Sequence, residues 1–109
     1  MAAKDVLVHQ SMTKNPAQVF PPGAFIREEL EARGWTQRAF AQILGRPLQN
    51  INGIINGKTA ITAVTAKQLA LVFGTSPELW LNLEMAYRLS TAAEPDPRIA
   101  RRAGKLALA

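Results

Sequence analysis

The stretch Thr36-Gln-Arg-Ala-Phe-Ala-Gln-Ile-Leu-Gly-Arg-Pro-Leu-Gln-Asn-Ile-Asn-Gly-Ile-Ile-Asn-Gly-Lys-Thr59 predicts two short helices joined by a tight turn. On each side of Gly45, apolar residues fall three and four positions apart, as they do on one face of a helix. The residues expected in the core are Phe40, Ile43 and Leu44 in the first helix and Ile51, Ile54 and Ile55 in the second. Gly45 suits the left-handed conformation that ends a helix, and Asn56-Gly57 suits the end of the second helix.

The second helix carries a row of carboxamide side chains outside its isoleucine stripe. They are Gln49, Asn50, Asn52 and Asn56. A carboxamide has both donors and an acceptor, so Gln or Asn can bond N6 and N7 of adenine together. The pattern therefore predicts that Gln49, Asn50 and Asn52 read base edges of double-stranded DNA. A solvated helix face is the alternative interpretation of the same residues.

This segment and its flanks resemble a known family. The two helices are similar to the helix-turn-helix of the Xre-type, phage-repressor regulators. Pro22-Gly23, Ala60-Ile61-Thr62 and the run from Phe73 to Leu83 resemble the HigA-type antitoxins more narrowly. The resemblance implies an all-α, five-helix repressor-like domain with N- and C-terminal arms. It also implies a homodimer that binds a palindromic operator, represses its own operon and neutralises a HigB-like, mRNA-cleaving toxin by direct contact.

The length of 109 residues and the apolar content of 48% are typical of one folded domain. We expect a flexible N-terminal arm at residues 1–20, a helix-turn-helix domain at 21–92 and a basic C-terminal tail at 93–109. The domain's first helix should begin at Pro22 and end at Arg33-Gly34, with Glu28, Glu29 and Glu31 facing outward. For the tail, a short basic helix and an unstructured arm are both compatible with the sequence.

Positive charge is concentrated around the two central helices. The net charge is +5, and no Asp or Glu occurs between residues 32 and 77. The cations in this interval are Arg33, Arg38, Arg46, Lys58 and Lys67. A locally cationic surface favours a polyanion such as double-stranded DNA, because phosphate neutralisation releases counterions. An ordinary solvated face is the alternative, since five cations over this length form no dense patch.

Several residues at the helix ends are candidates for contact with the DNA backbone. The resemblance places Gln37 there, and the free N–H groups and positive dipole end of a helix start agree with this role. Arg38 follows Gln37, and Lys58 and Thr59 lie in the turn after the second helix, where repressors contact phosphates. A helix-start glutamine without a DNA partner is the alternative reading of Gln37.

The turn itself departs from the family pattern at Arg46-Pro47-Leu48. We expect Arg46 to extend outward to a phosphate or a guanine edge, because an arginine is not buried unpaired. Leu48 either touches a thymine methyl group or packs against the core. Gly53 is unusual in mid-helix, where it costs about 1 kcal/mol relative to Ala. Close approach of the backbone to DNA or to a second subunit would explain it, as would an undemanding surface position.

The last helix of the domain, expected at about residues 77–92, is apolar almost all round. One buried stripe would close the core, so the surplus predicts a second buried surface. We expect a homodimer interface that includes Leu81, Met85 and Leu89, with the toxin as the rival occupant. Trp80 is expected in the core.

The sequence offers little for catalysis. It has no Cys, its one histidine is His9, and it has no clustered carboxylates and no phosphate-binding glycine loop. We therefore expect no enzyme activity, no metal and no cofactor. Neither a signal peptide nor a membrane span is apparent, so a cytoplasmic location is expected. Two other functions remain open: a stand-alone Xre-type regulator without a toxin, and a protein-interaction module that no longer binds DNA.

Overall fold

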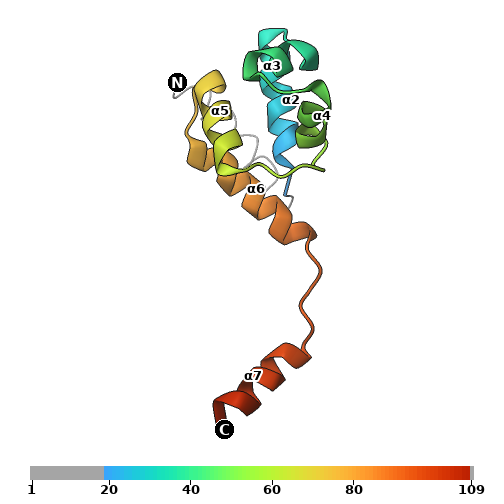
Figure 1. The fold of residues 1–109 in the computed structure, drawn as a ribbon, viewed down its shortest axis with the longest axis vertical. Coiled ribbons are helices and arrows are strands. Elements are labelled where there is room, and N and C mark those ends of the chain that lie inside the picture. The colour runs from blue at the N-terminus through green and yellow to red at the C-terminus, as the bar shows by residue number, and fades with distance from the viewer. Residues whose placement is uncertain (1–18, 109) are drawn as a thin grey trace.

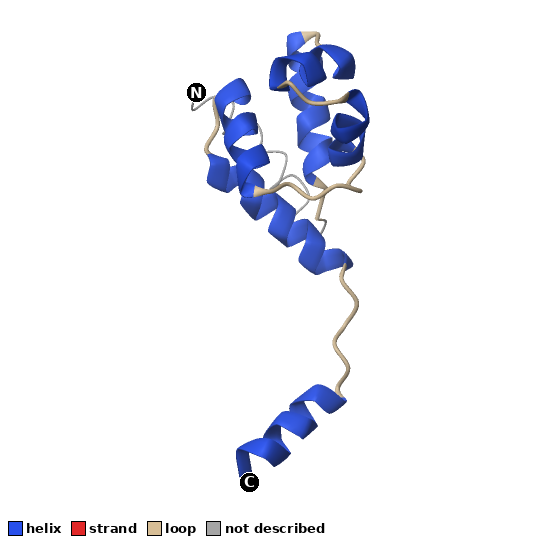
Figure 2. Ribbon diagram, in the orientation of Figure 1, coloured by secondary structure: helices blue, strands red, loops and turns tan. Residues whose placement is uncertain are grey.

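The computed structural model describes residues 19–108, and all regular structure in this range is helical (Figure 1). The helices are α2 (Pro22–Arg33), α3 (Gln37–Leu44), α4 (Leu48–Ile55), α5 (Ala63–Phe73), α6 (Pro77–Thr91) and α7 (Arg98–Leu108). Figure 2 shows them joined by loops, with no strand within residues 19–108. The all-α prediction is confirmed. Helices α2–α6 are the five expected, and α7 makes six. Most of the expected N-terminal arm lies outside the described residues.

The helices begin and end where local chemistry favours it. The hydroxyls of Thr36, Thr62 and Ser76 accept hydrogen bonds from backbone N–H groups in the first turns of α3, α5 and α6, at 3.0, 3.3 and 3.1 Å. These bonds satisfy N–H groups that have no partner within a helix. Gly45 has a φ of 67°, which a glycine adopts without strain, and it ends α3 before the tight turn. The predicted helix ends around the turn are confirmed.

The core lies among helices α2–α6, and its centre is aromatic. Phe73 stacks on Phe40 at 5.4 Å between ring centroids and meets Trp80 at 5.8 Å. Trp80 is fully buried, and its indole Nε1 donates to Thr75 Oγ1 at 2.6 Å. Trp80 is therefore a core residue, as predicted. The prediction that Ile43 lies in the core is wrong. No other element covers its position on α3, and 48% of the residue is exposed.

Glu29 is also placed differently from the prediction. It was expected to face outward, but it is only 6% exposed. It follows Phe25 and Ile26 by four and three residues, which puts it on the buried face of α2. Its carboxylate pairs with Arg33, whose guanidinium lies 4.9 Å from the Phe73 ring centroid. Burial lowers the pKa of the Arg33 guanidinium, and this cation belongs to the interior rather than to the cationic surface.

The basic tail forms helix α7, so of the two alternatives the short basic helix is the one observed. Figure 1 shows an extended linker between α6 and α7. Helix α7 stands apart from the other helices. Asp96 caps α7: its Oδ1 accepts from the Arg98 backbone N–H at 2.9 Å. The side-chain and backbone hydrogen bonds from Arg98 hold the pKa of the Asp96 carboxyl below its usual range. The cations of α7 are Arg98, Arg101, Arg102 and Lys105, all exposed.

Candidate nucleic-acid interface

Helix α4 presents one polar face away from the core. It packs on α2 and α3, and Ile51, Ile54 and Ile55 are each at most 4% exposed. At 100° per residue, Gln49 lies nearly opposite this isoleucine stripe, and it is exposed. Asn50 and Asn52 lie on the two flanks of the polar face and are half-buried. The sequence therefore places Gln49 correctly on an outward surface, with one asparagine on each side of it.

The start of α3 supplies the second part of the candidate interface. Arg38 is exposed and Gln37 is half-buried, directly after the N-cap residue Thr36. The first N–H groups of a helix have no partner within it. Among residues 19–108, Thr36 is the one residue whose side chain bonds to this turn, and it takes the N–H of Ala39. This end of α3 can bind a phosphate, since free N–H groups and the helix dipole both favour an anion.

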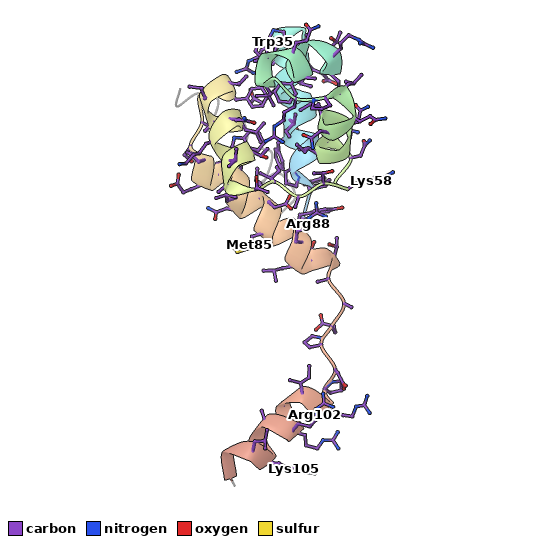
Figure 3. The ribbon with its side chains drawn as sticks, in the orientation of Figure 1. Trp35, Lys58, Met85, Arg88, Arg102 and Lys105 are labelled. Carbon is purple, nitrogen blue, oxygen red and sulfur yellow. The ribbon has the colours of Figure 1, made fainter. Side chains whose placement is uncertain are left out.

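The loop after α4 folds back onto that helix. The N–H groups of Lys58 and Thr59 both donate to the Gly53 carbonyl oxygen, at 2.9 and 3.0 Å. A Cβ on Gly53 would lie 2.5 Å from Thr59 Oγ1. The Thr59 side chain therefore supplies a reason for the glycine that lies within the chain. Lys58 projects from the loop and is exposed (Figure 3).

Arg46 does not extend outward as expected. Its side chain is half-buried and lies against α5, because three acceptors on the fold engage its guanidinium. Nε donates to Gln68 Oε1 at 2.8 Å, Nη2 to Thr65 Oγ1 at 2.8 Å and Nη1 to Asn50 Oδ1 at 2.9 Å. Arg46 therefore holds the turn to α5 and at the same time holds one of the predicted base-reading side chains. Leu48 packs partly against the core.

The cations predicted from the sequence divide into two groups. Arg33 and Arg46 are engaged inside the fold. Arg38, Lys58 and Lys67 are exposed, and within residues 19–108 none of them forms an ion pair. The second group is the part of the charge that is available to an external polyanion.

Sequence reasoning missed three residues that hold the side chains of this region in place. Thr65 and Gln68 on α5 bind Arg46, and Arg27 on α2 donates from Nη2 to Asn56 Oδ1 at 2.7 Å. These partners lie 19 to 29 positions apart in the chain, so no local pattern indicates the pairs. The Arg27 bond also ties Asn56 to α2.

The predicted dimer residues on α6 differ in exposure. Met85 and Leu89 are 57% and 72% exposed. They lie four residues apart and so share one face of the helix. Figure 3 shows Met85 on α6. Leu81 is half-buried and packs against the core. The exposed apolar surface therefore centres on Met85 and Leu89.

Within residues 19–108, no helix is long and apolar enough to cross a membrane. That same part of the chain holds no group of three or more His, Cys, Asp or Glu side chains that could bind a metal ion.

Comparison with known proteins bears directly on this geometry. Residues 26–80, which include α3, the turn and α4, match the helix-turn-helix family model. This chain belongs to the Xre-type helix-turn-helix family. It is 35% identical over 71 residues to the uncharacterised HTH-type transcriptional regulator YddM of Escherichia coli, covering 65% of this chain and 76% of YddM. It is 34% identical over 79 residues to antitoxin HigA-1 of Vibrio cholerae, covering 72% of this chain and 74% of HigA-1.

The fold of this family member is also found among solved antitoxins. The antitoxin HigA of Pseudomonas aeruginosa, solved with the higBA promoter, superposes with a TM-score of 0.64 at 31% identity. The match covers 68% of this chain and 82% of that protein. The resemblance to HigA-type antitoxins that the sequence indicated is therefore confirmed. The DNA-contacting residues and the dimer residues remain predictions.

Proposed function

We propose that this protein is a HigA-type antitoxin. As a homodimer it binds a palindromic operator and represses its own operon, and it neutralises a HigB-like ribonuclease toxin by direct binding. It acts by binding rather than by catalysis, without a cofactor, in the cytoplasm, where operator DNA is found. The coarser part of this proposal, a DNA-binding regulator of the helix-turn-helix family, rests on the family match and on the promoter-bound HigA relative.

The observation that carries the DNA-binding proposal is the orientation of α4. Its isoleucines are buried, and Gln49 on the opposite side is exposed. A helix with this arrangement can enter a major groove with its polar side chains against base edges. Gln37, Arg38, Lys58 and Thr59 flank that helix and are proposed to contact phosphates, which fixes its register on the duplex.

The homodimer is proposed from the exposed apolar pair on α6. Met85 and Leu89 would be covered in a two-fold contact between α6 helices, in which each residue meets its own copy or a near neighbour. Replacing Leu89 with Asp should convert the dimer to a monomer in light scattering. Met85→Lys is a second variant on the same face, and Lys67→Asp on α5 is a control at another exposed position. A dimer that persists in both α6 variants would place the interface elsewhere.

The alternative function is a stand-alone Xre-type regulator without a toxin. The relative YddM, described as a transcriptional regulator, favours it. Co-expression with the product of the adjacent reading frame distinguishes the two. An antitoxin would co-purify with that protein and restore growth of cells that express it. A stand-alone regulator would do neither, while still protecting its operator.

Nuclease footprinting of the gene's own upstream region tests the operator proposal. A dimer should protect two symmetric half-sites whose centres lie about one helical turn, or roughly 34 Å, apart, or a multiple of that distance. Protection of a single unsymmetric site would contradict the palindromic operator.

A further inference from the structure

We propose that Arg46 sets the base preference of Asn50, so that this asparagine faces guanine or thymine rather than adenine. The inference rests on the proposed DNA binding and adds the specificity of one position in the half-site. It starts from the hydrogen bond that joins Arg46 Nη1 to Asn50 Oδ1 at 2.9 Å.

The orientation of the Asn50 carboxamide follows from the chemistry of its partner. A guanidinium only donates hydrogen bonds, so the atom that faces it must be the carboxamide oxygen. For the same reason the carboxamide oxygen of Gln68 faces Arg46, and its Oε1 accepts from Arg46 Nε. A partner that only donates therefore sets the orientation of both carboxamides. Within residues 19–108, Asn50 Nδ2 has no hydrogen-bond partner and is the end of the side chain available to a base.

The guanidinium is itself held in place by a buried anchor. Its Nη2 donates to the hydroxyl of Thr65, which is only 2% exposed. That hydroxyl also lies 3.2 Å from Thr62 Oγ1, the N-cap of α5. Arg46 is therefore bound from three sides, and moving it away from Asn50 would leave Thr65 and Gln68 without their donor. Arg46 acts as a positioning residue for Asn50.

With its oxygen bonded to Arg46, Asn50 faces a base as a hydrogen-bond donor. A free asparagine reads adenine by accepting from N6 and donating to N7. Here the accepting oxygen is bonded to a cation, which repels the approaching N6 amino group even though a second lone pair remains. Asn50 Nδ2 suits an acceptor instead. Guanine presents N7 and O6 in the major groove, and thymine presents O4.

Selection of bound sequences from a library of randomised half-sites tests the proposal with the full chain. The wild-type protein should prefer guanine or thymine over adenine by about tenfold at one position, and Asn50→Ala should abolish the preference at that position alone. Arg46→Met keeps the aliphatic stem but removes the donors, and it should shift the same position toward adenine. Arg38→Ala removes an exposed cation that does not touch Asn50, so it should weaken binding without changing the preference.

Asn50→Asp keeps the test decisive even if Arg46→Met folds poorly. The carboxylate can still accept from Arg46, but it has no N–H to donate, so binding to guanine or thymine at that position should fall about tenfold or more. An adenine preference at the position that Asn50→Ala relaxes would overturn the proposal. An unchanged preference in both Asn50→Asp and a folded Arg46→Met would overturn it while leaving DNA binding intact. If the wild-type protein selected no DNA sequence from the library, the proposed function would be refuted, and the inference with it.

Discussion

Gly23, in the first turn of α2, lies directly against the main chain of Ile55 at the end of α4. A Cβ built on Gly23 would fall 1.7 Å from the Ile55 carbonyl oxygen and 2.5 Å from its carbonyl carbon. The obstacle is backbone rather than a movable side chain, so only a residue without a Cβ allows this approach. The contact fixes the position of α4 on the core, and with it the direction of the face that carries Gln49.

Gly23→Ala should therefore destabilise the fold. The two helices must separate to accept the methyl group, and overpacking of this kind costs about 1–3 kcal/mol. Gly104→Ala is the matched control, because Gly104 also lies in a helix and a Cβ there meets nothing within 4 Å. Urea unfolding followed by tryptophan fluorescence measures both. Equal free energies of unfolding for Gly23→Ala and the wild type would show that α2 and α4 are not packed this closely.

Gly53 and Thr59 should be energetically coupled. A Cβ at Gly53 meets the Thr59 hydroxyl at 2.5 Å, a side-chain atom that can be removed. In a Thr59→Ala background, Gly53→Ala should stabilise the protein by about 0.5–1 kcal/mol, as helix propensity predicts. In the wild-type background the gain should be smaller or reversed. A double-mutant cycle of unfolding free energies gives the coupling directly, and strict additivity would contradict the contact.

How far the sequence determines this structure can be seen from individual residues. The isoleucines of α4 recur at helical spacing and the caps Thr36, Thr62 and Ser76 precede their helices, so these features follow from local patterns. Ile43 fits the same spacing but is exposed, because periodicity does not say whether another element covers a position. Glu29 could have been placed inside, since it shares a face with Phe25 and Ile26.

For the candidate interface, the sequence predicts the exposed side chains that have no partner in the fold. The exposure of Gln49, Arg38 and Lys58 follows from their places on a helix face or in a turn, which local sequence indicates. Arg46 could not be placed, because its acceptors on α5 are brought to it by the packing of distant segments. The donor-rich character proposed for Asn50 likewise depends on a tertiary contact.

Gln49 and Lys58 should affect DNA binding differently. Gln49→Ala removes a proposed base contact and should cost about 1–3 kcal/mol on the operator while relaxing the base preference. Lys58→Ala removes a proposed phosphate contact, so it should weaken all sequences evenly and reduce the slope of log K against log salt by about one. Fluorescence anisotropy on operator and scrambled duplexes measures both. Equal losses on the two duplexes for Gln49→Ala would refute its role in base reading.

Helix α7 should lose order in acid. Hydrogen bonds from Arg98 lower the pKa of Asp96, so this carboxylate stabilises α7 above its unfolded pKa of about 3.9. That contribution is lost as the pH falls through the lower folded value, when the cap is protonated. Backbone amide shifts of α7 between about pH 6 and pH 2 report the change. Asp96→Ala should show reduced α7 helicity already at neutral pH, whereas Glu94→Gln should behave as the wild type. An acid transition of α7 that is unchanged in Asp96→Ala would contradict the cap.

The most direct test of the account is a binding titration of the full chain against DNA from upstream of its own gene, compared with a scrambled duplex. It should be run at about 50 and 200 mM salt. The outward face of α4 and the exposed cations beside it predict tight binding to the upstream DNA that weakens steeply with salt. They also predict a preference of about a thousandfold or more over the scrambled duplex. Absence of salt-sensitive binding, or equal affinity for the two duplexes, would contradict the claim that α4 reads DNA.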